Sequence, residues 1–357
     1  MSEPVRVLVV DDSAFVRRAV ERMLEEDTGI RVIGSAGNGA EAVSMVKDLR
    51  PDVVILDVNM PHLDGLQALE RIMTEAPTGV LMLSTLTREG AQTTLRALEL
   101  GAVDFLDKGV VGSTMDIYQM APTLREKVLA VAGASLPVPP PSSEPEQSDP
   151  TSNADVPPPT GDLEVVVIGA STGGPRALAE VLWRLPANFP AGIVIAQHMP
   201  PGFTETLASR LDKRSAVTVR EAHDHARIEP GVALLSPGGM QITLERFGGN
   251  LSVHLEESGA DDLHRPSVDV LFTSAAEVVG ARAIGVVLTG MGSDGAKGLQ
   301  AMQDAGAVTI AESQDTAVIY GMPRAAAPAA DRIVPLGRIA AALVEVASRR
   351  RHTEGPE

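Results

Sequence analysis

The sequence predicts two α/β domains in tandem, each built on a parallel sheet. Short β-branched segments alternate with amphipathic helical segments in both halves of the chain, and this alternation favours parallel sheets covered by helices. Between the halves, residues 133–162 are rich in Pro, Ser and acidic residues and nearly lack large apolar side chains, a composition typical of a linker. We therefore place the domains at residues 1–132 and 163–348, followed by a polar tail at 349–357.

Composition excludes several classes of protein. The net charge is −17 and no basic stripe stands out, which argues against nucleic-acid binding. The chain has no cysteine, so disulfides, a thiol nucleophile and Cys-ligated zinc are excluded. No apolar run reaches the roughly 18 residues that a membrane span needs, and the N-terminus carries no secretory signal pattern. We expect a cytoplasmic monomer that neither binds nucleic acid nor inserts into a membrane.

In the first half, five apolar segments are expected to form strands, and residues 14–26 and 66–75 show helical patterns. The expected strands are residues 5–10, 30–35, 53–57, 79–84 and 103–106. In a doubly wound sheet of this kind, the residues that follow the strands meet at one edge.

Polar residues with complementary chemistry follow these strands. Asp11 and Asp12 follow the first strand, Asp57 ends the third, Ser84 ends the fourth and Lys108 follows the fifth. Clustered carboxylates repel one another unless a hard cation such as Mg²⁺ lies among them. A carboxylate nucleophile, a hydroxyl, a lysine and a divalent cation together make a phosphoryl-transfer site. Helix capping could explain one of the aspartates but not the whole set.

These residues resemble the active site of a response-regulator receiver domain, and the resemblance covers residues 1 to about 125. It implies a flavodoxin-like fold, with Asp57 as the phosphoacceptor and a sensor histidine kinase as the phosphodonor. It also implies that Mg²⁺ is held by Asp11, Asp12, Asp57 and the backbone carbonyl of Asn59.

The same resemblance assigns the phosphoryl switch. It implies that Ser84 and Lys108 engage the phosphoryl group and that Phe105 moves on activation. One departure is Gly109, which stands where receiver domains usually carry proline, so we expect a looser loop after the fifth strand.

The second half repeats the strand and helix alternation and adds a hairpin. Strands are expected at residues 164–169, 192–196, 232–236 and 283–288. A shorter pair, residues 241–244 and 251–254, is separated by Phe247-Gly-Gly-Asn250, which predicts a hairpin turn.

The strand at 164–169 ends in the sequence Gly169-Ala-Ser-Thr-Gly173, a G-x-S-x-G pattern. Glycines allow the sharp turn from a strand into a helix, and that turn lifts the serine above the end of the sheet. Ser171 is therefore a candidate nucleophile. A glycine-rich turn before a helix also binds phosphate, so an anion-binding serine stays open on this motif alone.

Two further groups are expected at the same sheet edge. His198 follows the strand at 192–196, and Asp294 lies in the glycine-rich loop at 289–295. A serine nucleophile needs a base, and the base needs an orienting acid, so the set Ser171, His198 and Asp294 favours acyl transfer. The chain order Ser, His, Asp argues against the α/β-hydrolase fold, in which the acid precedes the histidine.

The remaining histidines carry weaker signals. Most of those at positions 62, 223, 225, 254 and 264 are expected to be surface or loop residues. His223-Asp224-His225 contains two histidines, but without further ligands the pattern is weak support for a metal site.

Residues from about 163 to 348 resemble the catalytic domain of the CheB family of chemotaxis protein-glutamate methylesterases. The motifs that carry this resemblance are Ile168-Gly-Ala-Ser-Thr-Gly-Gly174, Gln197-His-Met-Pro200, Gly202-Phe-Thr204, His264-Arg-Pro-Ser-Val-Asp269 and Leu288-Thr-Gly-Met-Gly-Ser-Asp-Gly295. One departure is Met240, which occupies a region where the family usually has a histidine, so the detail of the substrate cleft is expected to differ.

The CheB resemblance implies a reaction and its residues. The substrate would be a glutamate γ-methyl ester on the cytoplasmic helices of a chemoreceptor, with glutamine deamidation as a second activity. Ser171, His198 and Asp294 would be the catalytic triad, and the backbone of Met291 would stabilise the oxyanion. No cofactor is expected for the esterase step. Because a switch domain precedes the enzyme, we also expect the receiver to block the cleft until Asp57 is phosphorylated.

Two other classes stay open from the sequence. One is a phosphorylation-controlled binding protein without activity, against which the intact set Ser171, His198 and Asp294 argues. The other is a DNA-binding response regulator, against which the acidic charge argues.

Overall fold

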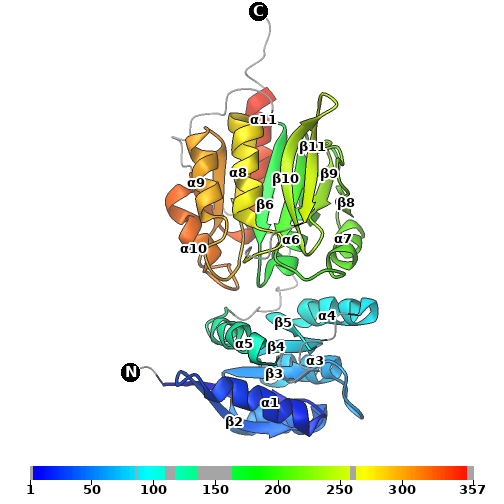
Figure 1. The fold of residues 1–357 in the computed structure, drawn as a ribbon, viewed down its shortest axis with the longest axis vertical. Helices are drawn as coiled ribbons and strands as arrows, with labels where there is room; N and C mark the ends of the chain where they lie inside the picture. Colours follow the sequence, from blue (N-terminus) through cyan, green and yellow to red (C-terminus); the bar gives the residue numbers. More distant parts are fainter. Residues whose placement is uncertain (1–2, 85–86, 109–116, 136–162, 258–262, 352–357) are drawn as a thin grey trace, which may run out of the picture.

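The computed structural model contains two parallel-sheet α/β domains, drawn in blue to cyan and in green to red in Figure 1. It describes residues 3–84, 87–108, 117–135, 163–257 and 263–351. Most of the predicted linker at 133–162, the end of the predicted tail at 349–357, and the loop that contains Gly109 lie outside the described residues.

The first domain has a five-stranded parallel sheet in the order β2-β1-β3-β4-β5. Helices α2, α3 and α4 pack on one face of it, and α1 and α5 pack on the other. The elements are β1 (Val5–Val10), α1 (Ala14–Glu25), β2 (Ile30–Ala36), α2 (Gly39–Leu49), β3 (Val53–Asp57), α3 (Gly65–Glu75), β4 (Gly79–Ser84), α4 (Arg88–Leu100), β5 (Asp104–Asp107) and α5 (Ile117–Ala132). All five strands predicted for this half are present, with ends within one residue of the predicted ones.

The second domain has a seven-stranded sheet in the order β14-β13-β12-β6-β7-β9-β8, together with a separate hairpin, β10-β11. Its elements are β6 (Val165–Ala170), α6 (Gly174–Trp183), β7 (Gly192–Gln197), α7 (Thr204–Asp212), β8 (Thr218–Glu221), β9 (Val232–Leu235), β10 (Met240–Phe247), β11 (Asn250–Glu257), α8 (Val268–Val278), η2 (Gly280–Arg282), β12 (Ala283–Val287), α9 (Ala296–Asp304), β13 (Val308–Glu312), α10 (Met322–Ala326), η3 (Ala327–Ala329), β14 (Arg332–Val334) and α11 (Leu336–Arg351).

The hairpin turn is where the sequence predicts it, but the two strands are longer than predicted. Phe247 pairs directly with Asn250, and Gly248 and Gly249 both have positive φ, which is typical of a tight two-residue hairpin turn. Three short strands, β8, β13 and β14, were not predicted.

The topology of each sheet determines where the candidate sites lie. β6 is fully buried and pairs with β12 on one side and with β7 on the other, so the chain changes direction of winding at β6. Helices α6, α7 and α11 cover one face of this sheet, and α8, α9, α10 and the hairpin cover the other. In the first domain the corresponding change lies between β1 and β3. Ligand sites in open α/β sheets form at such switch points, beyond the strand ends.

Candidate active site

Ser171 directly follows β6 at the switch point. Its N–H donates to the carbonyl of Thr289 at 3.0 Å, and its own carbonyl accepts from Gly174 N–H at 2.8 Å. The turn into α6 requires glycine, because Gly173 has a φ of 79° and a Cβ on Gly174 would lie 2.0 Å from Gln197 Oε1. The predicted turn is therefore present, with the serine side chain at its start.

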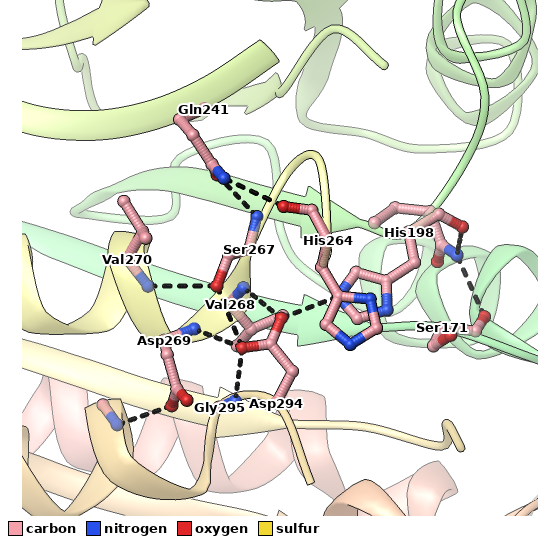
Figure 2. A network of polar contacts seen from close by, with 12 residues as sticks. Ser171, His198, Gln241, His264, Ser267, Val268, Asp269, Val270, Asp294 and Gly295 are labelled. Atoms are coloured by element: carbon pink, nitrogen blue, oxygen red, sulfur yellow. Dashed lines mark hydrogen bonds and ion pairs between the residues drawn. The ribbon is translucent and has the colours of Figure 1, made fainter. Parts of the chain in front are cut away.

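His198 and Asp294 form a hydrogen-bonded pair beside Ser171, as Figure 2 shows. His198 follows β7, and its Nε2 lies 2.8 Å from Asp294 Oδ2. The two side chains are 13% and 5% exposed, so solvent screens the pair only weakly. With Nε2 engaged by the carboxylate, Nδ1 is the imidazole nitrogen that remains to accept a proton. The structure thus brings together the three residues that the sequence placed at this edge.

The Asp294 carboxylate is held by donors on every side (Figure 2). Its Oδ2 also accepts from Val268 N–H, and its Oδ1 accepts from Ser267 Oγ and from the N–H groups of Asp269 and Gly295. Burial alone would raise the pKa of Asp294, but the hydrogen bond and charge of His198 and these N–H groups hold it well below its usual range. Asp294 therefore stays anionic and keeps the imidazole oriented.

His264 is a neighbour of the site to which sequence reasoning assigned no role. Its ring stacks on His198 with centroids 4.3 Å apart and an interplanar angle of 11°. Partial burial and the neighbouring His198 lower the pKa of His264, so at neutral pH it is an uncharged ring against the imidazole. His264 could have been found from its sequence position, because it begins the motif 264–269. Ser267 and Asp269 of that motif donate hydrogen bonds to Asp294.

The His198, His264 and Asp294 group has metal-ligand types, with ligand atoms within 4.8 Å of one another. A metal ion would have to compete for an Asp294 carboxylate that already accepts five hydrogen bonds. The donor set therefore fits an orienting acid better than a metal ligand.

Met291 lies in the glycine-rich loop between β12 and α9. The preceding residue is fixed, because Gly290 N–H donates to Ile319 O at 3.1 Å. Within the described residues, the Met291 N–H donates to no protein acceptor. This is the property that an oxyanion donor needs.

Adding a methyl group at Gly290 is expected to displace Ser171. A Cβ there would lie 2.3 Å from Met322 Sδ and 2.8 Å from Ser171 Cβ, so one of them must move. A misplacement of about 1 Å can cost on the order of 10²-fold in rate, and we expect Gly290→Ala to lower kcat by that order. Gly337→Ala, whose new methyl group would find its nearest atom at 3.9 Å, is the control and should keep its kcat. Equal kcat values in the two variants, measured on an ester substrate, would contradict the expectation.

The receiver residues converge at the edge of the first sheet. Lys108 Nζ lies 2.7 Å from Asp11 Oδ2 and 2.9 Å from Asp57 Oδ2. Burial raises the pKa of Asp57 to about 6, against the opposing effect of Lys108. Burial acts to lower the pKa of Lys108, but its hydrogen bonds to Asp11 and Asp57 raise it above its usual value.

The carboxylates of Asp11, Asp12 and Asp57 offer oxygens within 4.8 Å of one another, which suits a hard divalent cation such as Mg²⁺. Asp12 is exposed and the other two are buried, so the group opens to solvent on one side. Asn59 lies close enough for its N–H to bond Asp57. The donor set therefore fits the predicted cation.

The other two predicted switch residues, Ser84 and Phe105, lie in different surroundings. Ser84 Oγ is buried and accepts from Thr94 Oγ1 of α4 at 2.5 Å, a contact that the sequence did not indicate. Phe105 does not pack within its own domain alone, because its ring stacks on Phe203 of the second domain with centroids 4.8 Å apart.

Comparison with known proteins agrees with this geometry. The family model described as CheB methylesterase matches residues 166–343, and the response regulator receiver domain model matches residues 7–117. A curated Pseudomonas aeruginosa protein, named protein-glutamate methylesterase/protein-glutamine glutaminase 2, is 44% identical over 97% of this chain and 98% of its own length. The chain belongs to the CheB methylesterase family.

Other members of the family are similar to this chain in sequence and in structure. The protein-glutamate methylesterase/protein-glutamine glutaminase of Geobacillus kaustophilus is 44% identical over 96% of this chain and 98% of its own. The crystal structure of the Thermotoga maritima CheB methylesterase catalytic domain aligns with a TM-score of 0.50 at 42% identity, covering 52% of this chain and 99% of that one. The predicted family, the two-domain fold class and the assignment as an enzyme of this hydrolase family are confirmed. In the part of the chain that the structure describes, no helix is both long and apolar enough to cross a bilayer.

Proposed function

We propose that this CheB family member removes methyl groups from glutamate γ-methyl esters on the cytoplasmic helices of chemoreceptors, deamidates glutamines there, and is activated by phosphorylation. The observation that carries the proposal is the position of Ser171 at the β6 switch point, beside the hydrogen-bonded pair of the largely buried His198 and the buried Asp294. The relatives' names supply the two activities.

The reaction follows from the groups at this edge. His198 Nδ1 takes the proton from Ser171 Oγ as the oxygen attacks the ester carbonyl, and Asp294 stabilises the imidazolium that forms. The Met291 N–H donates to the tetrahedral oxyanion. His198 then returns the proton to the leaving group, methanol departs, and water hydrolyses the acyl-enzyme by the same route. A glutamine side chain undergoes the same acyl transfer with ammonia as the leaving group.

In the receiver, Asp57 would accept a phosphoryl group from a sensor histidine kinase. Mg²⁺, held by Asp11, Asp12, Asp57 and the carbonyl of Asn59, would neutralise charge on the phosphoryl oxygens. Lys108, which pairs with Asp11 and Asp57, would move to bind the phosphoryl group. The Ser84 hydroxyl would leave Thr94 and donate a hydrogen bond to a phosphoryl oxygen.

Contacts between the domains support autoinhibition. Thr172, the residue after the nucleophile, donates through Oγ1 to Asp104 Oδ2 of β5 at 2.5 Å. The neighbouring Phe105 stacks on Phe203 at the start of α7. Receiver side chains therefore lie directly against the turn that carries Ser171, and a change at Phe105 would disturb the contact.

An ion pair extends the same interface. Arg210 of α7 donates to Glu99 Oε1 at 3.0 Å and to Gln92 O at 2.7 Å, both on α4. A conformational change in α4 on phosphorylation would therefore reach α7 as well as the nucleophile turn.

Phosphorylation is expected to raise the esterase rate of the full-length protein. Allosteric couplings are typically about 5- to 150-fold, and we expect a small phosphodonor with Mg²⁺ to increase the rate within that range. Residues 163–357 alone should be active without phosphodonor; the relative's catalytic domain was solved as a separate chain. Equal rates for full-length protein, phosphorylated protein and the isolated domain would exclude autoinhibition.

Two full-length variants sharpen this experiment. Arg210→Ala removes the contacts with Glu99 and Gln92 and should raise the rate without phosphodonor by up to about fivefold, since a partly exposed ion pair contributes up to about 1 kcal/mol. Arg184→Ala is the matched control, because the contacts that Arg184 makes among the described residues are local ones, with Glu180 of α6 and the ring of Trp183. An equal rise in both variants would remove the interface as the cause.

A further inference from the structure

A carboxylate outside the predicted triad lies beneath the nucleophile turn. Glu312 is the last residue of β13 and has no exposed surface. Its Oε2 accepts from Thr289 N–H at 2.8 Å, and its Oε1 accepts from Thr316 Oγ1 at 3.0 Å. Among the described residues it forms no ion pair with a cation.

Thr289 connects this carboxylate to Ser171. The Thr289 carbonyl accepts from Ser171 N–H at 3.0 Å. The Thr289 hydroxyl donates to Thr172 O at 3.0 Å and accepts from Ile319 N–H at 2.9 Å. Thr289 therefore holds the backbone of the nucleophile and of the residue after it, and Glu312 in turn holds the backbone of Thr289.

The arrangement is costly for the fold. Burying a carboxylate without a cation is unfavourable, and burial raises the pKa of Glu312 to about 7 in spite of the two hydrogen bonds that it accepts. One of those two bonds nevertheless satisfies the buried Thr289 N–H, at the first residue of the loop that also carries Met291 and Asp294. An unsatisfied N–H at that point would leave the loop free to shift relative to β6.

We propose that Glu312 is a positioning residue for the hydrolysis: by accepting from Thr289 N–H it fixes the Ser171 backbone against the loop that carries Met291 and Asp294. This inference rests on the proposed function for its reaction. It assigns Glu312 no contact with substrate, so its loss should lower kcat and leave KM nearly unchanged.

The test compares Glu312→Ala with Glu312→Gln in the full-length chain. Glutamine keeps an amide oxygen within reach of Thr289 N–H, whereas alanine removes the acceptor. On a γ-glutamyl methyl ester peptide we expect Glu312→Ala to lose on the order of 10²-fold in kcat with KM within twofold, and Glu312→Gln to recover most of the loss. Glu312→Ala at the wild-type kcat, or Glu312→Gln as slow as Glu312→Ala, would overturn the proposal.

A matched control separates positioning from general stability. Asp331 accepts from Thr309 N–H at 2.8 Å and from its hydroxyl at 3.0 Å, near the other end of β13. Asp331→Ala should lower the melting temperature and leave kcat unchanged. If it reduced kcat as much as Glu312→Ala does, the role of Glu312 would be structural only.

Two further measurements test the position of Ser171 without the ester substrate or without Glu312→Ala. The rate at which a fluorophosphonate labels Ser171, followed by intact mass, reports the geometry of the serine even if the ester peptide is not a substrate. The labelling rate should fall in Glu312→Ala and recover in Glu312→Gln. If Glu312→Ala does not fold, Glu312→Asp keeps a carboxylate but draws it one methylene away from Thr289 N–H, and it should slow labelling about tenfold. Unchanged labelling in Glu312→Asp would overturn the proposal.

Discussion

Ser171→Ala is expected to abolish methyl-ester hydrolysis, with kcat falling by about 10⁶-fold, as loss of the nucleophile does in comparable triads. The fold should persist, because the hydrogen bonds that Ser171 makes to Thr289 and Gly174 use its backbone, which alanine retains. The measurement is mass spectrometry of receptor methyl groups with wild-type and variant protein, together with the melting temperature of each.

A second serine provides the control for this variant. Ser293 lies in the same glycine-rich loop and is exposed, so Ser293→Ala should keep wild-type kcat. Retained hydrolysis in Ser171→Ala would remove Ser171 as the nucleophile. A wild-type protein without hydrolysis would favour a phosphorylation-controlled binding protein instead, and a mobility shift with DNA would favour a DNA-binding regulator.

Much of the candidate site could be predicted because its signals are local. The glycines around Ser171 specify a strand-to-helix turn, and parallel pairing brings the residues after β6, β7 and β12 to one edge. Five strands of the first domain were predictable for a similar reason, since each is a short apolar run bounded by helical pattern. His198 and Asp294 follow from this logic without any knowledge of their contacts.

The parts that escaped prediction depend on contacts between distant residues. β8 (Thr218–Glu221) and β14 (Arg332–Val334) are the two edge strands of their sheet, carry charged residues and lack the continuous buried apolar run of the central strands. In the sequence, Glu312 is a charged residue after a short apolar run, which indicates an exposed position. It is buried because the Thr289 N–H and the Thr316 hydroxyl donate hydrogen bonds to its carboxylate. His264 shows no periodicity that would place it on the ring of His198.

The interface between the domains is the least predictable feature. Phe105 and Phe203 come from different domains, and their stacking depends on how two folded units meet. Neither local propensity nor strand order encodes that arrangement, so the sequence supported autoinhibition only as a hypothesis from domain order.

Asp294→Asn is expected to lower kcat by about 10⁴-fold, as the equivalent change does in a Ser-His-Asp triad. The asparagine amide carries no charge to stabilise the imidazolium of His198 and replaces one acceptor oxygen with a donor. That donor would face the Val268 N–H in the position of Oδ2 or the Asp269 N–H in the position of Oδ1, both of which are now bonded to the carboxylate. Each unsatisfied group costs about 1–3 kcal/mol, so the melting temperature should fall as well.

The pH dependence separates the effect of Asp294→Asn on stability from its effect on kcat. Folding holds the pKa of Asp294 well below its usual value near 3.8, so the charged form stabilises the fold at neutral pH. That contribution is present above about pH 4 and fades as pH falls toward the folded-state pKa. The stability gap between wild type and Asp294→Asn should therefore narrow below pH 4, while kcat differs throughout the neutral range.

Asp269→Asn is the matched control for this variant. The Asp269 carboxylate accepts from Gly298 N–H at 2.7 Å, a bond that an asparagine oxygen can also accept, and its backbone N–H still reaches Asp294. This variant should retain kcat within a few-fold. If Asp294→Asn kept kcat within tenfold of wild type, His198 would not depend on this carboxylate for its orientation, and the acid of the triad would have to be sought elsewhere.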